Sequence, residues 1–87
     1  MAHKSAEEIE RELKAAKTRV RVGGVYSHFK NSKHLVKVLR IGVWEPTDRL
    51  CVIYQEVANP SLVFARDLEV WLEEPLKDTP RFKLVEL

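Results

Sequence analysis

The stretch LVKVLRIGVWEPTDRLCVIYQEV, residues 35–57, decides the fold of this chain. Two runs within it, 35–44 and 50–57, are rich in β-branched and apolar residues, which favour strands. The segment between the runs contains Pro46, followed two positions later by an aspartate. Proline fixes φ and aspartate bonds to its own backbone, so this segment predicts a tight turn between two antiparallel strands. Gly42 interrupts the first run, and there we expect a β-bulge that bends the sheet.

Shorter runs of the same kind lie on both sides of this hairpin. They are apolar or alternate between apolar and polar residues, and polar turn residues separate them. The segment 66–72 fits either a short helical turn or a strand, and the acidic, proline-bounded segment 73–80 predicts a loop. We expect further strands at 25–29, 62–65 and 81–85, with turns at 30–33 and 58–61.

The N-terminal segment predicts an amphipathic helix that ends near Thr18. Ser5 and Glu8 form a capping-box pattern, in which the serine hydroxyl accepts a hydrogen bond from the amide three residues on. Apolar side chains recur on one narrow stripe, which suits docking on a barrel or on a second copy of the chain. The stripe consists of Ile9, Leu13, Ala16 and Val20, and the first three are the candidate contacts for self-association or for a protein partner.

A chain of 87 residues has room for one domain, and it is too short for a (β/α)₈ barrel or a full dinucleotide-binding fold. Such a chain cannot cover an open sheet on both faces, and closing the sheet hides its edges. We therefore expect a mainly β protein: a small SH3-like β-barrel of four to five antiparallel strands, preceded by the N-terminal amphipathic helix. Residues 1–23 would form the helix and a linker, and residues 24–87 the barrel domain.

The composition is that of a globular domain, which we expect to be cytoplasmic. Apolar residues make up 45% of the chain and charged residues 32%, and the net charge is +2. Cys51 is the single cysteine, so it forms no intramolecular disulfide, and its apolar surroundings predict a buried thiol. The sequence contains neither a signal-peptide pattern nor an apolar stretch of membrane-spanning length. No pair of histidines has helical metal-ligand spacing, and we expect no metal and no cofactor.

Four pieces of the sequence occur together in the order that one known family shows. They are GVYSHFK at 24–30, VIY at 52–54, RDLEVW at 66–71 and PRF at 80–82. Through these pieces the region 24–82 resembles domain of unknown function 1653, a family of small bacterial proteins. The resemblance implies an SH3-like barrel, and because the family has no assigned activity it implies none for this chain.

The chain departs from that family's pattern at two places. The run Val-Trp-Glu-Pro at 43–46 stands where the family usually carries His-Ser-Glu-Thr, and Asp67 replaces the usual proline. If the missing histidine belongs to a site, that site is altered in this chain. The N-terminal helix precedes the shared region and is an addition to it.

Tyr26, His28 and Lys30 alternate along the first predicted strand, so their side chains project from one face. With Arg66 they could form a patch that binds a phosphate or a carboxylate, because a guanidinium and an ammonium would lie beside an imidazole. The alternative is structural: the tyrosine packs at the barrel edge, the histidine bonds to a turn carbonyl and the lysine is solvated. Trp44 is a further candidate for a partner surface, since it is a large aromatic residue beside a turn.

The other large aromatic residues, Phe64, Trp71 and Phe82, are more typical of a core than of a contact surface. Trp71 and Phe82 align with aromatic positions of the family that the chain resembles, and we expect both to be buried.

Positive charge is concentrated in residues 11–40, which hold nine lysines and arginines and one glutamate, a net charge of +8. Residues 41–87 carry a net charge of −4. One interpretation is that the basic segment neutralises nucleic-acid phosphates. The other is that its basic helix and strand positions face the acidic second half, within the chain or across a dimer. The nucleic-acid interpretation assigns the contacts to Lys14, Lys17, Arg19, Arg21, Lys33, Lys37 and Arg40.

No catalytic constellation accompanies these groups. The sequence lacks a glycine-rich phosphate loop and a nucleophile-elbow pattern, and sequence nearness does not place its paired carboxylates across a cleft. We therefore expect not an enzyme but a non-enzymatic binding or protein-interaction module built on a small β-barrel. The alternative function is a nucleic-acid-binding small barrel that uses the basic segment 11–40.

Overall fold

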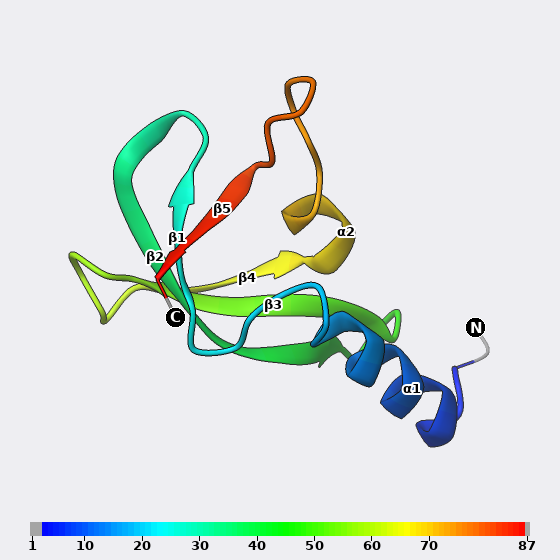
Figure 1. Ribbon diagram of the computed structural model, residues 1–87. Coiled ribbons are helices and arrows are strands. Elements are labelled where there is room, and N and C mark those ends of the chain that lie inside the picture. Colours follow the sequence, from blue (N-terminus) through cyan, green and yellow to red (C-terminus); the bar gives the residue numbers. More distant parts are fainter. Residues whose placement is uncertain (1–2, 87) are drawn as a thin grey trace.

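The computed structural model describes residues 3–86, and it confirms a mainly β protein with an N-terminal helix (Figure 1). Five antiparallel strands form one sheet in the order β4-β3-β2-β1-β5. The segment that could be helix or strand is both, because β4 runs directly into a short helix. The elements are α1 Ala6–Ala16, β1 Val25–His28, β2 Asn31–Trp44, β3 Arg49–Glu56, β4 Val63–Asp67, α2 Leu68–Trp71 and β5 Phe82–Glu86.

The sheet does not close into a barrel, so that part of the prediction is wrong. β4 pairs with β3 and β5 pairs with β1, and the two edge strands are not hydrogen-bonded to each other. The reason lies at Asp67, whose carboxylate accepts from the backbone N–H groups of Glu69 and Val70 and so caps α2. The chain therefore turns away from the edge of β4 instead of pairing along it, and α2 covers the open side (Figure 1).

Trp71 of α2 joins the two edges of the open sheet. Its ring stacks on Phe82 of β5 with the ring centroids 3.8 Å apart, and it also contacts the rings of Tyr26 and Tyr54 at 5.3 Å and 5.2 Å. Trp71 is 2% exposed and Phe82 7%, as the sequence predicts. Phe64 is not a core residue, although its type is more typical of a core: it lies on edge strand β4, is 43% exposed and packs against Tyr54.

The β-bulge of β2 lies at Leu39 and not at Gly42. The pairing of β2 with β3 shifts between Val38 and Arg40, which leaves Leu39 as the extra residue. The extra residue reverses the alternation, so Val38 and Ile41 are both buried while Arg40 is exposed. A strictly alternating strand would have placed the arginine in the core.

Helix α1 packs against its own sheet. Its N-terminus is capped as predicted, since the Ser5 hydroxyl accepts from the backbone N–H of Glu8 at 3.1 Å. Ala16 and Val20 are buried in the core cluster, and Leu13 packs against it. Two helix residues of the predicted apolar stripe, Leu13 and Ala16, thus pack within the chain, beside the end of the sheet where β2 and β3 meet (Figure 1), whereas Ile9 is not part of the core cluster.

Replacing Trp71 by alanine should lower the free energy of unfolding by about 3–5 kcal/mol, the usual cost of removing a buried tryptophan. The Trp71 ring contacts Phe82 of edge strand β5 as well as Tyr26 and Tyr54, so its loss opens the core at Phe82. Urea denaturation followed by circular dichroism measures the change. The neighbouring Val70→Ala, at a position that is 37% exposed, is the matched control and should stay within about 0.5 kcal/mol of wild type. A loss below about 1 kcal/mol in Trp71→Ala would contradict this role.

Candidate functional site

Five basic side chains gather at the end of the sheet where the gap between β4 and β5 lies. They come from the end of β1 and the turn after it, from β2, from β4 and from the residue before β5. They surround two aromatic rings, one from the β1–β2 turn and one from β5. This group, which we call the His28 cluster, consists of His28, Lys30, His34, Arg66 and Arg81 with the rings of Phe29 and Phe82.

His28 lies at the centre of the cluster. The register pairs it with Phe82 of β5, and the centroid of its ring lies 5.2 Å from that of Phe82 and 4.9 Å from that of Phe29. The ring of His34 is 6.0 Å away. Nδ1 of His28 accepts a hydrogen bond from the backbone N–H of Lys30 at 3.2 Å, which assigns the proton of the neutral ring to Nε2. His28 therefore presents an N–H donor at Nε2.

The surroundings of His28 keep it uncharged. Burial lowers the pKa of its imidazole below the ordinary value, and the neighbouring positive charges of His34, Arg66, Arg81 and Lys30 lower this pKa further. All these neighbours disfavour a proton for the same reason, since each adds a like charge. At neutral pH the ring is thus a neutral hydrogen-bond donor among cations.

Few carboxylates reach this group. Arg81 forms an ion pair with Glu73 at 3.2 Å, and His34 bonds to Glu56 at 2.9 Å. Arg66 and Lys30 form no ion pair with the described side chains of residues 3–85, and each lies over an aromatic ring instead. The Arg66 guanidinium is 5.5 Å from the ring centre of Phe82, and the Lys30 ammonium is 5.8 Å from that of Phe29. Two permanent positive charges therefore stand without a counter-charge beside His28.

Comparison with known proteins identifies a family but no activity. A family model described as "Protein of unknown function (DUF1653)" matches residues 24–84. The chain belongs to the DUF1653 family. No curated protein and no solved structure matches it. The DUF1653 region contains the whole His28 cluster, whereas α1 lies before it.

Within the DUF1653 region, the structure brings together three of the five predicted site residues. His28, Lys30 and Arg66 belong to one cluster, while Tyr26 and Trp44 do not. The hydroxyl of Tyr26 accepts from the backbone N–H of Arg21 at 2.8 Å, and its ring packs on Trp71, so it has a structural role. Trp44 is 57% exposed, as predicted, but it lies at the far end of β2.

Sequence reasoning missed Arg81, His34 and Phe82 as members of the site. Arg81 and Phe82 stand beside His28 because β5 pairs with β1, and this pairing joins segments more than fifty residues apart. A signal existed in the PRF piece at 80–82, which carries part of the family resemblance. The PRF piece does not show which strand it pairs with.

The residues of the nucleic-acid interpretation divide between α1, the segment after it and β2. None of the nine lysines and arginines of 11–40 forms an ion pair within the part of the chain that the structure describes. Within the described side chains, the charges of the basic segment are therefore not neutralised by ion pairs with the acidic half of the chain. Lys14, Lys33, Lys37 and Arg40 are exposed on α1 and β2.

Lys17, Arg19 and Arg21 line a groove of about 590 Å³ between the end of α1 and β5. Lys83 of β5 lines it too, and no carboxylate among the described side chains does. We call this feature the basic groove, and it borders on Phe82.

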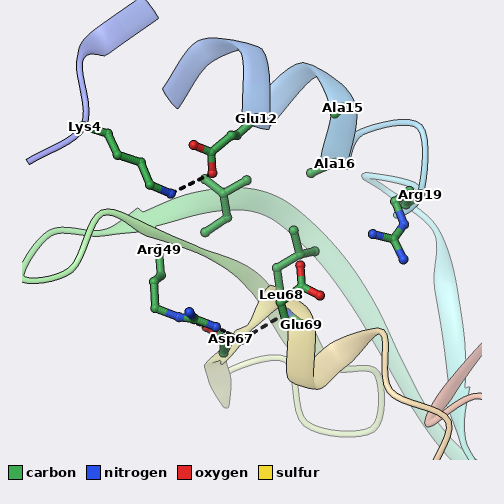
Figure 2. A pocket seen from close by; sticks show the side chains of 10 residues that line it. Lys4, Glu12, Ala15, Ala16, Arg19, Arg49, Asp67, Leu68 and Glu69 are labelled. Atoms are coloured by element: carbon green, nitrogen blue, oxygen red, sulfur yellow. Dashed lines mark hydrogen bonds and ion pairs between the residues drawn. The ribbon is translucent and has the colours of Figure 1, made fainter. Parts of the chain in front are cut away.

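A second hollow, of about 320 Å³, lies between α1, β3 and α2 (Figure 2). Figure 2 shows its two ion pairs: Lys4 bonds to Glu12 at 2.8 Å, and Arg49 bonds to Asp67 through two contacts of 2.7 Å and 2.9 Å. Acidic and basic groups thus neutralise each other here. In contrast to the basic groove, this hollow offers no excess of one charge.

Three other features of the described residues bear on function. No three of their His, Cys, Asp or Glu side chains gather in a group that could hold a metal ion. Neither α1 nor α2 has the length and apolar character of a helix that crosses a bilayer. Cys51 is buried, as predicted, and burial raises the pKa of its thiol, which therefore stays uncharged at neutral pH.

Replacing Arg66 by glutamine should raise the pKa of His28 toward its ordinary value. The substitution removes one of the positive charges that disfavour the imidazolium, and leaves burial of the ring unchanged. NMR titration of the imidazole proton signals measures this pKa. Arg40→Gln removes an exposed guanidinium from β2 outside the cluster and should leave the pKa where it is in wild type. Equal pKa values in all three proteins would show that Arg66 does not act on His28.

Proposed function

We propose that this domain is a non-enzymatic binding module that recognises an anionic group of its partner at the His28 cluster. The observation that carries the proposal is the pair of cations, Arg66 and Lys30, that stand without a carboxylate beside a neutral imidazole donor. A phosphate or carboxylate placed there would supply the missing counter-charge. It would also accept hydrogen bonds from a guanidinium, an ammonium and an N–H group.

The electrostatic cost of the cluster supports a binding role. Like charges held close together repel, and a folded domain gains no stability from such an arrangement. Groups whose protonation is disturbed by a set of neighbouring charges are concentrated at functional sites. The cation–π contacts of Arg66 and Lys30 are worth only about 0.5–1 kcal/mol each at exposed positions, so they do not account for the gathering of charges by themselves.

The chemistry available at the cluster favours binding over catalysis. The two carboxylates that reach it, Glu56 and Glu73, are both engaged by basic partners. The one cysteine is buried elsewhere in the sheet with a protonated thiol. A general base and an activated nucleophile are the groups that a hydrolytic or transfer reaction needs, and the proposal assigns neither.

Titration with sodium phosphate and with sodium acetate, at constant ionic strength, tests this function. Chemical-shift changes of the backbone amides should be confined to residues 28–34, Arg66 and residues 81–82, and should saturate in the millimolar range. Arg66→Gln should bind at least about tenfold more weakly, a loss of about 1.4 kcal/mol. Arg40→Gln is the matched control and should bind as wild type does. Small shifts spread evenly over the surface, unchanged by Arg66→Gln, would remove the proposal.

A second candidate function is nucleic-acid binding, and the basic groove favours it. Four cations without a carboxylate line a groove larger than a single phosphate needs. Binding to a phosphate backbone releases counterions, so the affinity falls steeply with salt. The aromatic rings beside the groove, Tyr26 and Phe82, are buried, so the contacts would be to phosphates and not to bases.

Fluorescence anisotropy with a labelled single-stranded oligonucleotide at several salt concentrations tests this second function. Four phosphate contacts predict a slope of about −3 for log K against log salt, at about −0.7 for each contact. The double variant Arg19→Gln/Lys83→Gln should reduce the slope by about half. Lys77→Gln, which removes a lysine from the loop between α2 and β5, should leave it unchanged. Absence of binding at low salt would exclude nucleic acid as the partner.

A further inference from the structure

We infer that the anion recognised by the His28 cluster is the doubly charged phosphate of a monoester or of the free ion, rather than a carboxylate. This inference rests on the proposed function and names the chemical class of its ligand. It follows from the number of uncompensated charges in the cluster and from the number of separate segments that supply its donors.

The charges of the cluster match a dianion. Arg81 and His34 already have acidic partners, Glu73 and Glu56. Arg66 and Lys30 remain, with two permanent positive charges between them. A carboxylate would neutralise one of these charges, whereas a phosphate monoester carries between about 1.5 and 2 negative charges at neutral pH. Only the phosphate neutralises both.

The donors also match a tetrahedral group. A carboxylate has two oxygens in one plane, and a single guanidinium fork satisfies both. Here the donors come from three separate segments: Nε2 of His28 at the end of β1, the ammonium of Lys30 in the turn after it, and the guanidinium of Arg66 on β4. Arg66 and Lys30 lie over the two rings that His28 contacts, and the charge of each lowers the pKa of His28. Three separate donors can serve the three terminal oxygens of a phosphate, one each, whereas a carboxylate offers only two oxygens.

The neutral state of His28 has a place in this arrangement. Because Nδ1 accepts from the Lys30 backbone, the neutral ring can donate only through Nε2. The same hydrogen bond fixes the start of the turn that carries the Lys30 side chain. A glutamine at position 28 could offer an amide N–H near the Nε2 position, whereas an asparagine would reproduce only the acceptor near Nδ1.

Isothermal titration calorimetry of the full chain with three phenyl compounds tests the inference. The titrations are made at about pH 7.5, because a phosphate ester loses its second proton near about pH 6 and is then a dianion. Phenyl phosphate is a tetrahedral dianion, phenyl sulfate a tetrahedral monoanion and benzoate a planar monoanion. We expect phenyl phosphate to bind about tenfold or more tightly than either of the others. Inorganic phosphate is the fourth ligand. If it binds as tightly as phenyl phosphate, the phosphate group alone is recognised, and if it binds more weakly, the ester is recognised as well. Both results support the inference.

Variants place the binding at the cluster. Arg66→Gln and Lys30→Gln should each remove most of the preference for phenyl phosphate over phenyl sulfate, because each removes one of the two unpaired charges. His28→Gln should bind phenyl phosphate more tightly than His28→Asn does, and Arg40→Gln should bind as wild type does. Benzoate binding as tightly as phenyl phosphate would overturn the inference and leave the proposed function standing. Failure of all four ligands to bind would overturn both.

Discussion

The ring of Phe82 holds together a sheet that has two free edges. Trp71 stacks on it from the helix that follows β4, His28 contacts it from β1, and Arg66 reaches it from β4. Phe82 itself lies on edge strand β5. Its side chain therefore connects β5 with β1 and with the residues of β4 and α2 at the other edge of the sheet. A closed barrel would make these connections by backbone hydrogen bonds, and here aromatic and cation–π contacts make them instead.

The open side explains why the basic groups meet where they do. β4 and β5 do not pair, and Arg66 of β4 lies over the Phe82 ring that β5 supplies. His28 and Lys30 arrive from the neighbouring end of β1, and Arg81 from the residue before β5. This gathering of like charges does not stabilise the folded domain. Natural proteins commonly lose some stability in this way at their functional sites. The proposed anion site is thus a consequence of how the sheet is left open.

Local pattern was enough to predict most of the elements. Alternation and turn residues located the central hairpin and the flanking strands, and the Ser5–Glu8 pattern located the start of α1. The sequence pattern did not show that the sheet stays open, because this depends on the path that Asp67 imposes on the chain after β4. The bulge was expected at Gly42 because glycine favours such places, but packing placed it at Leu39.

Part of the site was readable in the sequence as well. His28 ends β1 and Lys30 lies in the turn directly after it, so their nearness in the sequence accounts for their shared place in the cluster. Arg66 was predicted as a site residue because its guanidinium suits a phosphate or a carboxylate. Its position over Phe82, however, depends on the open sheet. Arg81 and His34 join the site through the pairing of β1 with β5 and with β2. Tyr26, on the same face of β1, was diverted to the core by its hydrogen bond to the backbone of Arg21.

The thermal midpoint in sodium phosphate, compared with sodium chloride at the same ionic strength, tests most directly whether the His28 cluster is an anion site. A ligand at tenfold its dissociation constant adds about 1.4 kcal/mol to the stability, and this raises the midpoint of a domain of this size by about 6–11 °C. Phosphate also strengthens apolar burial in any protein, so the quantity to compare is the gain of wild type over that of Arg66→Gln. The account predicts a larger gain for wild type by several degrees. The same gain in both proteins would contradict it.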